Sequence, residues 1–307
     1  MTARVAQLRT ITKRFGLSLG DALLLIWFSI NTGVLLAPFI RYPWILGGDA
    51  VIYARAAALW LAGQDPWGPI PGTSVRLVSH PHLLLFYAPF VGLSNVGIVW
   101  VIGLLALSAF ALRRLGLPYW WLAFPPLADA IRWGSSDALV FALLVLGPRW
   151  LAPIAKPYTA LPLLGDRRWR DIAIALVVGL IATLFLPWQL FLSHLADIAV
   201  EIGLNAQDLS VFGEPIAMVV AIVALAALGW RRALWLATPV LWPLTQLHYA
   251  AMTIPALTRS VAFFFAVPIP GAPLVGVVAA AILARFAPSL DPPIVRPSGE
   301  PGSPQTF

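Results

Sequence analysis

The sequence predicts an all-α polytopic membrane protein, a bundle of about eight transmembrane helices, within a range of about eight to ten. Of its 307 residues, 60% are hydrophobic and only 11% are charged. That is more apolar surface than a soluble globule of this length can bury. The basic residues are scattered through short segments between apolar runs, a pattern that marks the cytoplasmic side of a membrane.

Charge and cysteine content exclude several classes of function. The formal net charge is +7, but its scatter between apolar runs indicates membrane topology, so we expect no nucleic-acid partner. The chain contains no cysteine. Disulfides, thiolate nucleophiles and cysteine-ligated metals are therefore excluded.

The two ends of the chain differ from its centre. Residues 1–18 are basic and precede an apolar stretch over 19–40 that is too long for the core of a signal peptide. We expect a cytoplasmic N-terminus and a first membrane span that is retained. The transmembrane region extends over 19–286, and the tail at 287–307, rich in Pro, Ser and Gly, is expected to be disordered.

Between these ends, helices and outer loops are expected to alternate. Residues 41–94 form the first outer loop, whose apolar part at 83–93 is too short to span and is predicted to lie in the interface. Further crossings are predicted over 95–112, 117–131, 171–187, 216–230, 233–257 and 261–285, with an acidic outer loop over 188–214.

Residues 138–165 allow two interpretations, because Gly147-Pro148-Arg149 splits this apolar run into two pieces. If both pieces span, the chain crosses nine times and every later loop changes side. If they form one broken or re-entrant unit, it crosses eight times. We favour the broken unit, because it places more of the 20 basic residues in the cytoplasm.

One hydrophilic stretch of the first outer loop, residues 47–67, presents an acid beside the membrane. Asp49 is predicted to be the N-cap of a short helix that stops at Gly63, before a turn at Asp65-Pro66. Helical spacing places Tyr53 on the same face as Asp49. The carboxylate of Asp49 is either only a helix cap or a group that takes part in chemistry.

The order of several short motifs carries a family resemblance. The run Asp49-x-x-x-Tyr53 to Gly63-x-Asp65-Pro66-Trp67 is followed by further matching pieces. These are His80-Pro81-His82-Leu83, Ala88-Pro89, Lys156-Pro157 and His248-Tyr249. Over about residues 20–260 the chain resembles GT-C glycosyltransferases, in particular glycosyltransferase family 87, the polyprenol-phosphate-mannose-dependent mannosyltransferases. It departs from the family at Ser135-Ser136 and at Tyr158-Thr159.

The resemblance implies a GT-C-like fold and a membrane hexosyltransferase. It would move mannose from a polyprenyl-phosphate-linked donor to a glycan or lipid acceptor at the non-cytoplasmic face, surrounded by membrane lipid. The expected location is a bacterial-type plasma membrane, crossed several times. Asp49 would be the catalytic base. The chain has neither a Gly-rich phosphate loop nor an Asp-x-Asp pair, so a soluble nucleotide-sugar donor is disfavoured, and we predict no cofactor and no metal.

Two residues in apolar segments are candidates for binding the donor phosphate. Lys156 is an isolated ammonium in an apolar run, which either meets a phosphate or extends to the nearer membrane surface. His248 either donates to phosphate or sugar or is packed and hydrogen-bonded in the core. Asp129 and Arg132 are three residues apart, so they either pair with each other or belong to the site.

Four residues of the outer loop complete the predicted substrate site. Tyr53 follows Asp49 by one helical turn, and His80 and His82 flank a proline, where both could reach a polar head group. Asp65 is either a substrate ligand or part of a turn. Metal binding by the two histidines would need further ligands that the sequence does not place.

Two other classes of function fit the same sequence. A transporter or flippase of a lipid-linked or small polar substrate would concentrate polar groups at the bilayer midplane in paired broken helices. A non-catalytic subunit of a membrane complex is the third class. Most candidate polar residues fall in one loop and at outer helix ends, which favours the glycosyltransferase.

Overall fold

The computed structural model describes residues 18–70, 75–205 and 208–295 of the chain, and within these ranges the secondary structure is helical, without strands. The expectations for residues 1–17 and 296–307 lie outside the described residues. The α-helices and 3₁₀ helices (η) are, in chain order, α2 (Leu19–Arg41), η1 (Pro43–Ile45), α3 (Gly48–Leu61), α4 (Leu83–Tyr87), η2 (Ala88–Phe90), α5 (Val96–Arg114), η3 (Tyr119–Ala123), α6 (Pro125–Trp133), α7 (Ser136–Leu146), α8 (Leu151–Ala155), η4 (Pro157–Thr159), α9 (Ala160–Gly165), α10 (Trp169–Thr183), α11 (Trp188–Ser193), α12 (Leu195–Asn205), α13 (Pro215–Ala227), α14 (Trp230–Leu241), η5 (Leu247–Ala256), α15 (Arg259–Phe265) and α16 (Ala272–Phe286).

Two helices of the described part are long and apolar enough to cross a membrane. They are α2, with 23 residues, and α5, with 19 residues. Large apolar side chains are also exposed on shorter helices, such as Leu180 on α10, Ile216 on α13 and Phe286 on α16. Extended apolar surface of this kind suits contact with lipid. The helical fold is confirmed, and the number of membrane crossings remains a prediction.

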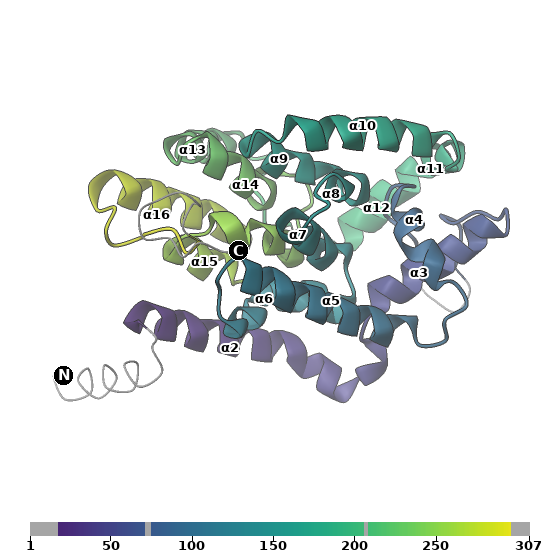
Figure 1. Ribbon diagram of the computed structural model, residues 1–307, viewed down its shortest axis with the longest axis horizontal. Coiled ribbons are helices and arrows are strands. Elements are labelled where there is room, and N and C mark those ends of the chain that lie inside the picture. Colours follow the sequence, from purple (N-terminus) through teal and green to yellow (C-terminus); the bar gives the residue numbers. More distant parts are fainter. Residues whose placement is uncertain (1–17, 71–74, 206–207, 296–307) are drawn as a thin grey trace.

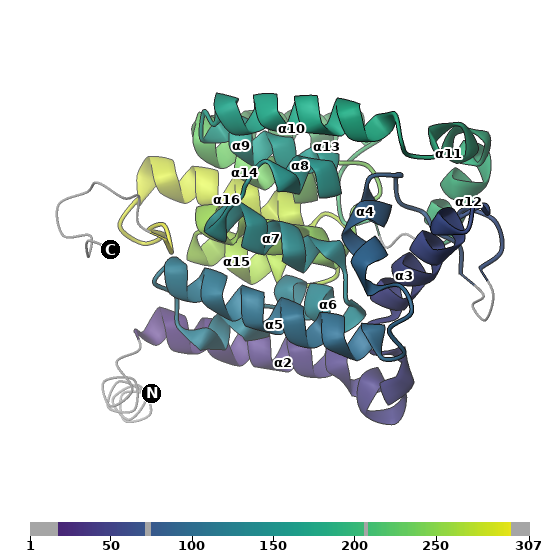
Figure 2. The same cartoon turned by 45° about the vertical axis from the view of Figure 1, so that its right-hand side comes forward.

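The helices form a bundle with one distinct end. Helices α2, α5 and α10 run along the bundle, whereas α3, α4, α11 and α12 gather at one end of it (Figures 1 and 2). We call this the α3 end. It contains the described part of the predicted first outer loop and of the acidic loop that was expected on the same side.

The start of α3 differs from the prediction that Asp49 caps this helix. Gly47 is the N-cap, with a left-handed φ of 72°, and Asp49 lies in the first turn without a capping hydrogen bond. The chain turns at Gly47 because its backbone packs directly against that of Gly97 at the start of α5. A residue without a Cβ atom is required there. The predicted stop at Gly63, with φ 70°, is confirmed.

Several predicted crossings are interrupted at prolines. The segment 117–131 consists of η3 and α6, which begins at Pro125. The predicted crossing over 233–257 is also not one helix, because α14 ends before Pro243 and the separate helix η5 follows. Likewise, 261–285 is divided into α15 and α16 by Pro268 and Pro270. Proline lacks an amide hydrogen and disfavours a helical residue before it.

The segment 138–165 is broken as the favoured interpretation required. Helix α7 has 11 residues, α8 has five and α9 has six, so none of them is long enough to cross a bilayer alone. The breaks fall at Gly147-Pro148 and at Lys156-Pro157.

The predicted disorder of the tail was wrong for residues 287–295. Asp291 is buried, and its carboxylate accepts hydrogen bonds from the backbone N–H and the hydroxyl of Ser260 at the start of α15. The Ile294 N–H donates to the Leu257 carbonyl at 2.9 Å. A carboxylate at a helix N-terminus satisfies otherwise unpaired amides, so composition alone missed this contact.

Because α3 and α5 approach closely, we expect alanine substitutions at two glycines that flank α3 to lower stability by different amounts. Gly63→Ala meets no atom within 4 Å and should lower the free energy of unfolding by about 1–2 kcal/mol, the cost of a left-handed φ. Gly47→Ala has the same φ penalty and places a Cβ atom 2.5 Å from the Gly97 carbonyl oxygen. The Gly47→Ala variant should therefore lose roughly 2 kcal/mol more of its free energy of unfolding than the Gly63→Ala variant. Thermal unfolding in detergent measures both losses. Equal losses for the two variants would contradict this packing.

Candidate functional site

Two buried aspartates meet where α6 ends and α7 begins. Asp129 lies on α6 and Asp137 lies in the first turn of α7, with exposed fractions of 5% and 1%. The left-handed Gly134 ends α6, and Ser135 caps α7 and donates its hydroxyl to Asp137 at 2.8 Å. The turn between the helices therefore fixes both carboxylates inside the bundle.

Lys156 is the counterion of Asp137. It lies between α8 and η4 in an extended conformation, as expected for a residue before proline. Its Nζ is 3.6 Å from Asp137 Oδ2 and 5.4 Å from the centre of the Tyr249 ring. The Tyr158 hydroxyl donates to the other carboxylate oxygen of Asp137. Lys156 is 9% exposed, so the alternative that it extends to a membrane surface was wrong.

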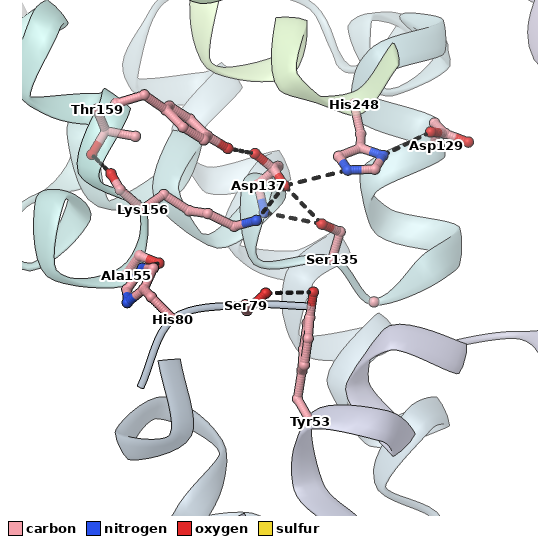
Figure 3. A network of polar contacts seen from close by, with 12 residues as sticks. Tyr53, Ser79, His80, Asp129, Ser135, Asp137, Ala155, Lys156, Thr159 and His248 are labelled. Carbon is pink, nitrogen blue, oxygen red and sulfur yellow. Dashed lines mark hydrogen bonds and ion pairs between the residues drawn. The ribbon is translucent and has the colours of Figure 1, made fainter. Parts of the chain in front are cut away.

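His248 connects the two aspartates. This η5 residue has Nδ1 3.1 Å from Asp129 Oδ2 and Nε2 3.6 Å from Asp137 Oδ2 (Figure 3). Nδ1 is within hydrogen-bond distance of Asp129, and Nε2 is within ion-pair distance of Asp137, so a positively charged imidazolium matches the carboxylate on each side. Arg132 pairs with Asp129, with 2.7 Å between Nε and Oδ1, and also donates to the Leu35 carbonyl. The predicted i, i+3 pair therefore forms and is also part of the cluster.

We call Asp129, Arg132, Asp137, Lys156 and His248 the buried charge network. With His248 protonated, three positive groups face two carboxylates. The network by itself therefore has a surplus of positive charge. A further anion beside it is favoured electrostatically, because charges interact strongly in a low-dielectric interior.

Asp49 supplies a carboxylate near this surplus. Among the described residues it has no hydrogen-bond or ion-pair partner, in contrast to Asp129 and Asp137. Burial raises the pKa of Asp49 to about 6, while the charges of His248 and Lys156 act in the opposite direction. The α3 end therefore holds a carboxylate that can gain and lose a proton near neutral pH.

Tyr53 and His80 extend the site from the α3 end toward Lys156. Tyr53 follows Asp49 by one turn of α3, and its hydroxyl is 3.3 Å from that of Ser79 (Figure 3). His80 Nε2 is 3.0 Å from the carbonyl oxygen of Ala155, the residue before Lys156. Burial lowers the pKa of His80 to about 3, so its imidazole is neutral and donates from Nε2. Its Nδ1 is buried without a partner among the described residues.

Asp65 and His82 have partners outside the buried charge network. Asp65 accepts from the Trp67 backbone N–H at 3.0 Å and lies 2.7 Å from Nε2 of His194, near α12. This geometry fits the turn role of Asp65. His82 Nε2 is 2.9 Å from the Gly179 carbonyl oxygen on α10. Both residues hold the α3 end together.

Sequence reasoning missed the role of Asp137. An acid in the first turn of an apolar helix fits a cap, and Ser135 does cap α7. The sequence did contain a signal for this pair. An isolated lysine in an apolar segment requires an anionic partner, and Asp137 is an acid in a neighbouring apolar segment. Among the described residues no group of three or more His, Cys, Asp or Glu side chains is arranged to hold a metal ion.

Comparisons with protein families, curated proteins and solved structures gave no match to this chain.

The pairing of Lys156 with Asp137 predicts strong energetic coupling. Lys156→Met leaves a buried carboxylate without its ammonium and should lower stability by about 3–5 kcal/mol. The double variant Lys156→Met/Asp137→Asn should lose less than the sum of the single variants. The matched control is Arg76→Met, which breaks the exposed pair with Asp197 and should cost less than about 1 kcal/mol. Similar thermal unfolding of Lys156→Met and Arg76→Met would argue against a buried pair.

Proposed function

We propose that this chain is a membrane hexosyltransferase of the GT-C type that uses a polyprenyl-phosphate-linked sugar as donor. One observation carries the proposal: an unpaired carboxylate, Asp49, lies within electrostatic range of Lys156 and His248 at one end of the bundle. Glycosyl transfer from a phosphate needs a base for the acceptor and positive groups for the departing phosphate. Both kinds of group are present here.

In the proposed reaction, the acceptor hydroxyl gives its proton to the Asp49 carboxylate while its oxygen attacks the anomeric carbon. The bond from that carbon to the phosphate oxygen breaks, and the electron pair leaves with the polyprenyl phosphate. Lys156 and His248 stabilise the negative charge on the phosphate. Attack opposite to the leaving group inverts the anomeric carbon. Mannose as the hexose follows from the family resemblance alone.

The proposed topology places the α3 end outside the cytoplasm, with about eight crossings of the cell membrane. Helix α5 begins at Val96, beside the contact between Gly97 and Gly47, the N-cap of α3, and ends in Arg113 and Arg114. Helix α10 starts at Trp169, after two arginines, and its last turns contact His82 at the α3 end. These four arginines therefore lie at the end opposite to α3, where the positive-inside rule places basic residues.

A transporter or flippase is the second candidate, and helix breaks inside the bundle favour it. Buried Asp137 lies beside the break between α6 and α7, and Lys156 lies beside the break between α8 and η4. Charged groups at paired broken helices are typical of transporters that bind ions at the bilayer midplane. In a transporter, Asp49 would bind a proton or a substrate cation, and the substrate would cross the membrane without a change in its covalent bonds.

The pKa of Asp49 predicts how sugar transfer depends on pH. A base acts as the carboxylate, which is populated above a pKa of about 6 and lost below it. We therefore expect kcat/KM to be level above about pH 7 and to fall close to tenfold per pH unit below about pH 6. Initial rates of transfer from a radiolabelled polyprenyl-phosphate hexose measure this profile. A profile that is flat through pH 6 would remove Asp49 from the role of base.

Asp49→Asn separates the catalytic role from a structural one. Asn has nearly the same size, and Asp49 makes no capping hydrogen bond, so thermal unfolding should be unchanged. Turnover should fall by on the order of 10²-fold, because an amide cannot accept the proton. The control is Asp197→Asn, an exposed acid on α12 at the same end, which should keep wild-type turnover. Near wild-type turnover in the Asp49→Asn variant is the result that contradicts the proposal.

A further inference from the structure

A second cluster of charged side chains lies at the end of the bundle opposite to α3. A surface cavity of about 630 Å³ is lined there by four arginines and two tryptophans. We call it the basic cavity, and its lining residues are Arg149, Trp150, Arg167, Arg168, Trp169, Arg170, Asp171 and Ile174. None of them belongs to the buried charge network.

The broken segment of the fold builds this cavity. The turn after α7 supplies Arg149, whose Nε donates to the Leu144 carbonyl at 2.8 Å. The turn between α9 and α10 supplies Arg167 and Arg168, and the first turn of α10 supplies Arg170. Arg167 adopts the left-handed φ of 56° that is uncommon for a residue with a side chain. The two turns thus bring arginines from separate parts of the sequence around one space.

The arginines of the basic cavity are not neutralised within the described residues. None of the four has an ion-pair partner there, whereas nearby Arg231 pairs with Asp166 at 2.6 Å. Asp171 is the single carboxylate in the lining. Like charges around one space repel one another, so an anion that bridges them would be bound favourably.

We propose that the basic cavity binds a phosphate-bearing anion, the headgroup of an anionic membrane lipid. Guanidinium groups match phosphate oxygens with paired hydrogen bonds. Trp169, 61% exposed, and its neighbour Trp150 are of the residue type that lies at headgroup depth. Basic pockets at the cytoplasmic surface are typical sites for such headgroups. The inference rests on the membrane location of the chain and is independent of sugar transfer.

The test compares two pairs of arginines at the same end of the bundle. Arg168→Gln/Arg170→Gln removes two exposed charges from the cavity, and Arg113→Gln/Arg114→Gln removes two at the end of α5, outside its lining. Native mass spectrometry of purified protein titrated with cardiolipin measures lipid affinity. We expect the affinity for cardiolipin to fall about tenfold or more in the cavity variant and less than about twofold in the control variant. Thermal unfolding of both variants should match that of the unmodified protein.

A second ligand distinguishes the source of the phosphate. Inorganic pyrophosphate is titrated against the same three proteins, with thermal unfolding as the measurement. Binding of cardiolipin but not pyrophosphate supports a lipid headgroup, and binding of pyrophosphate alone overturns it in favour of a soluble phosphate at the same cavity. If neither ligand binds, or if the cavity and control variants lose equal affinity, the proposed site is wrong. Because sugar transfer is not measured, failure here leaves the proposed function untouched.

Discussion

The pairing of Lys156 with Asp137 is the interaction on which the interior of this protein depends. An isolated ammonium or carboxylate inside an apolar bundle is costly, and each of these groups is tolerated because the other lies 3.6 Å away. The Asp137 carboxylate also accepts a hydrogen bond from the Tyr158 hydroxyl and lies within ion-pair distance of His248. His248 lies within ion-pair distance of Asp129 as well. The position of one carboxylate therefore constrains α6, α7, η4 and η5 together.

The broken helices follow from this constraint. A continuous helix from α8 to α9 would carry Lys156 in a regular turn, whereas the break before Pro157 extends its backbone and directs the side chain to Asp137. The α6–α7 break similarly places Asp129 and Asp137 on two helices that meet at one point. Asp49 stands beside this arrangement without a partner among the described residues, which leaves its carboxylate available for the role of base in the proposed reaction.

Much of the fold could be predicted, because long apolar segments and Gly and Pro punctuation are local signals. The helices at 19–41 and 96–114, the stop at Gly63 and the broken 138–165 segment all followed from such signals. The convergence of Asp49, Lys156 and His248 was less accessible, since it depends on contacts between distant segments. The identity of the Lys156 counterion required the tertiary structure, because a helix cap and a functional acid look alike in sequence. The division of 233–257 beside Pro243 was open to the same local reasoning and was missed.

The most direct test of the central claim is the fate of the donor in proteoliposomes that contain the purified chain, polyprenyl-phosphate hexose and a membrane-lipid and glycan extract as acceptor. The measurement is the release of free polyprenyl phosphate, which does not require the acceptor to be known. We expect release of polyprenyl phosphate that depends on the protein and is lost in the Asp49→Asn variant. Passage of the intact lipid-linked sugar to the other leaflet, with no polyprenyl phosphate released, would contradict a transferase and favour a transporter.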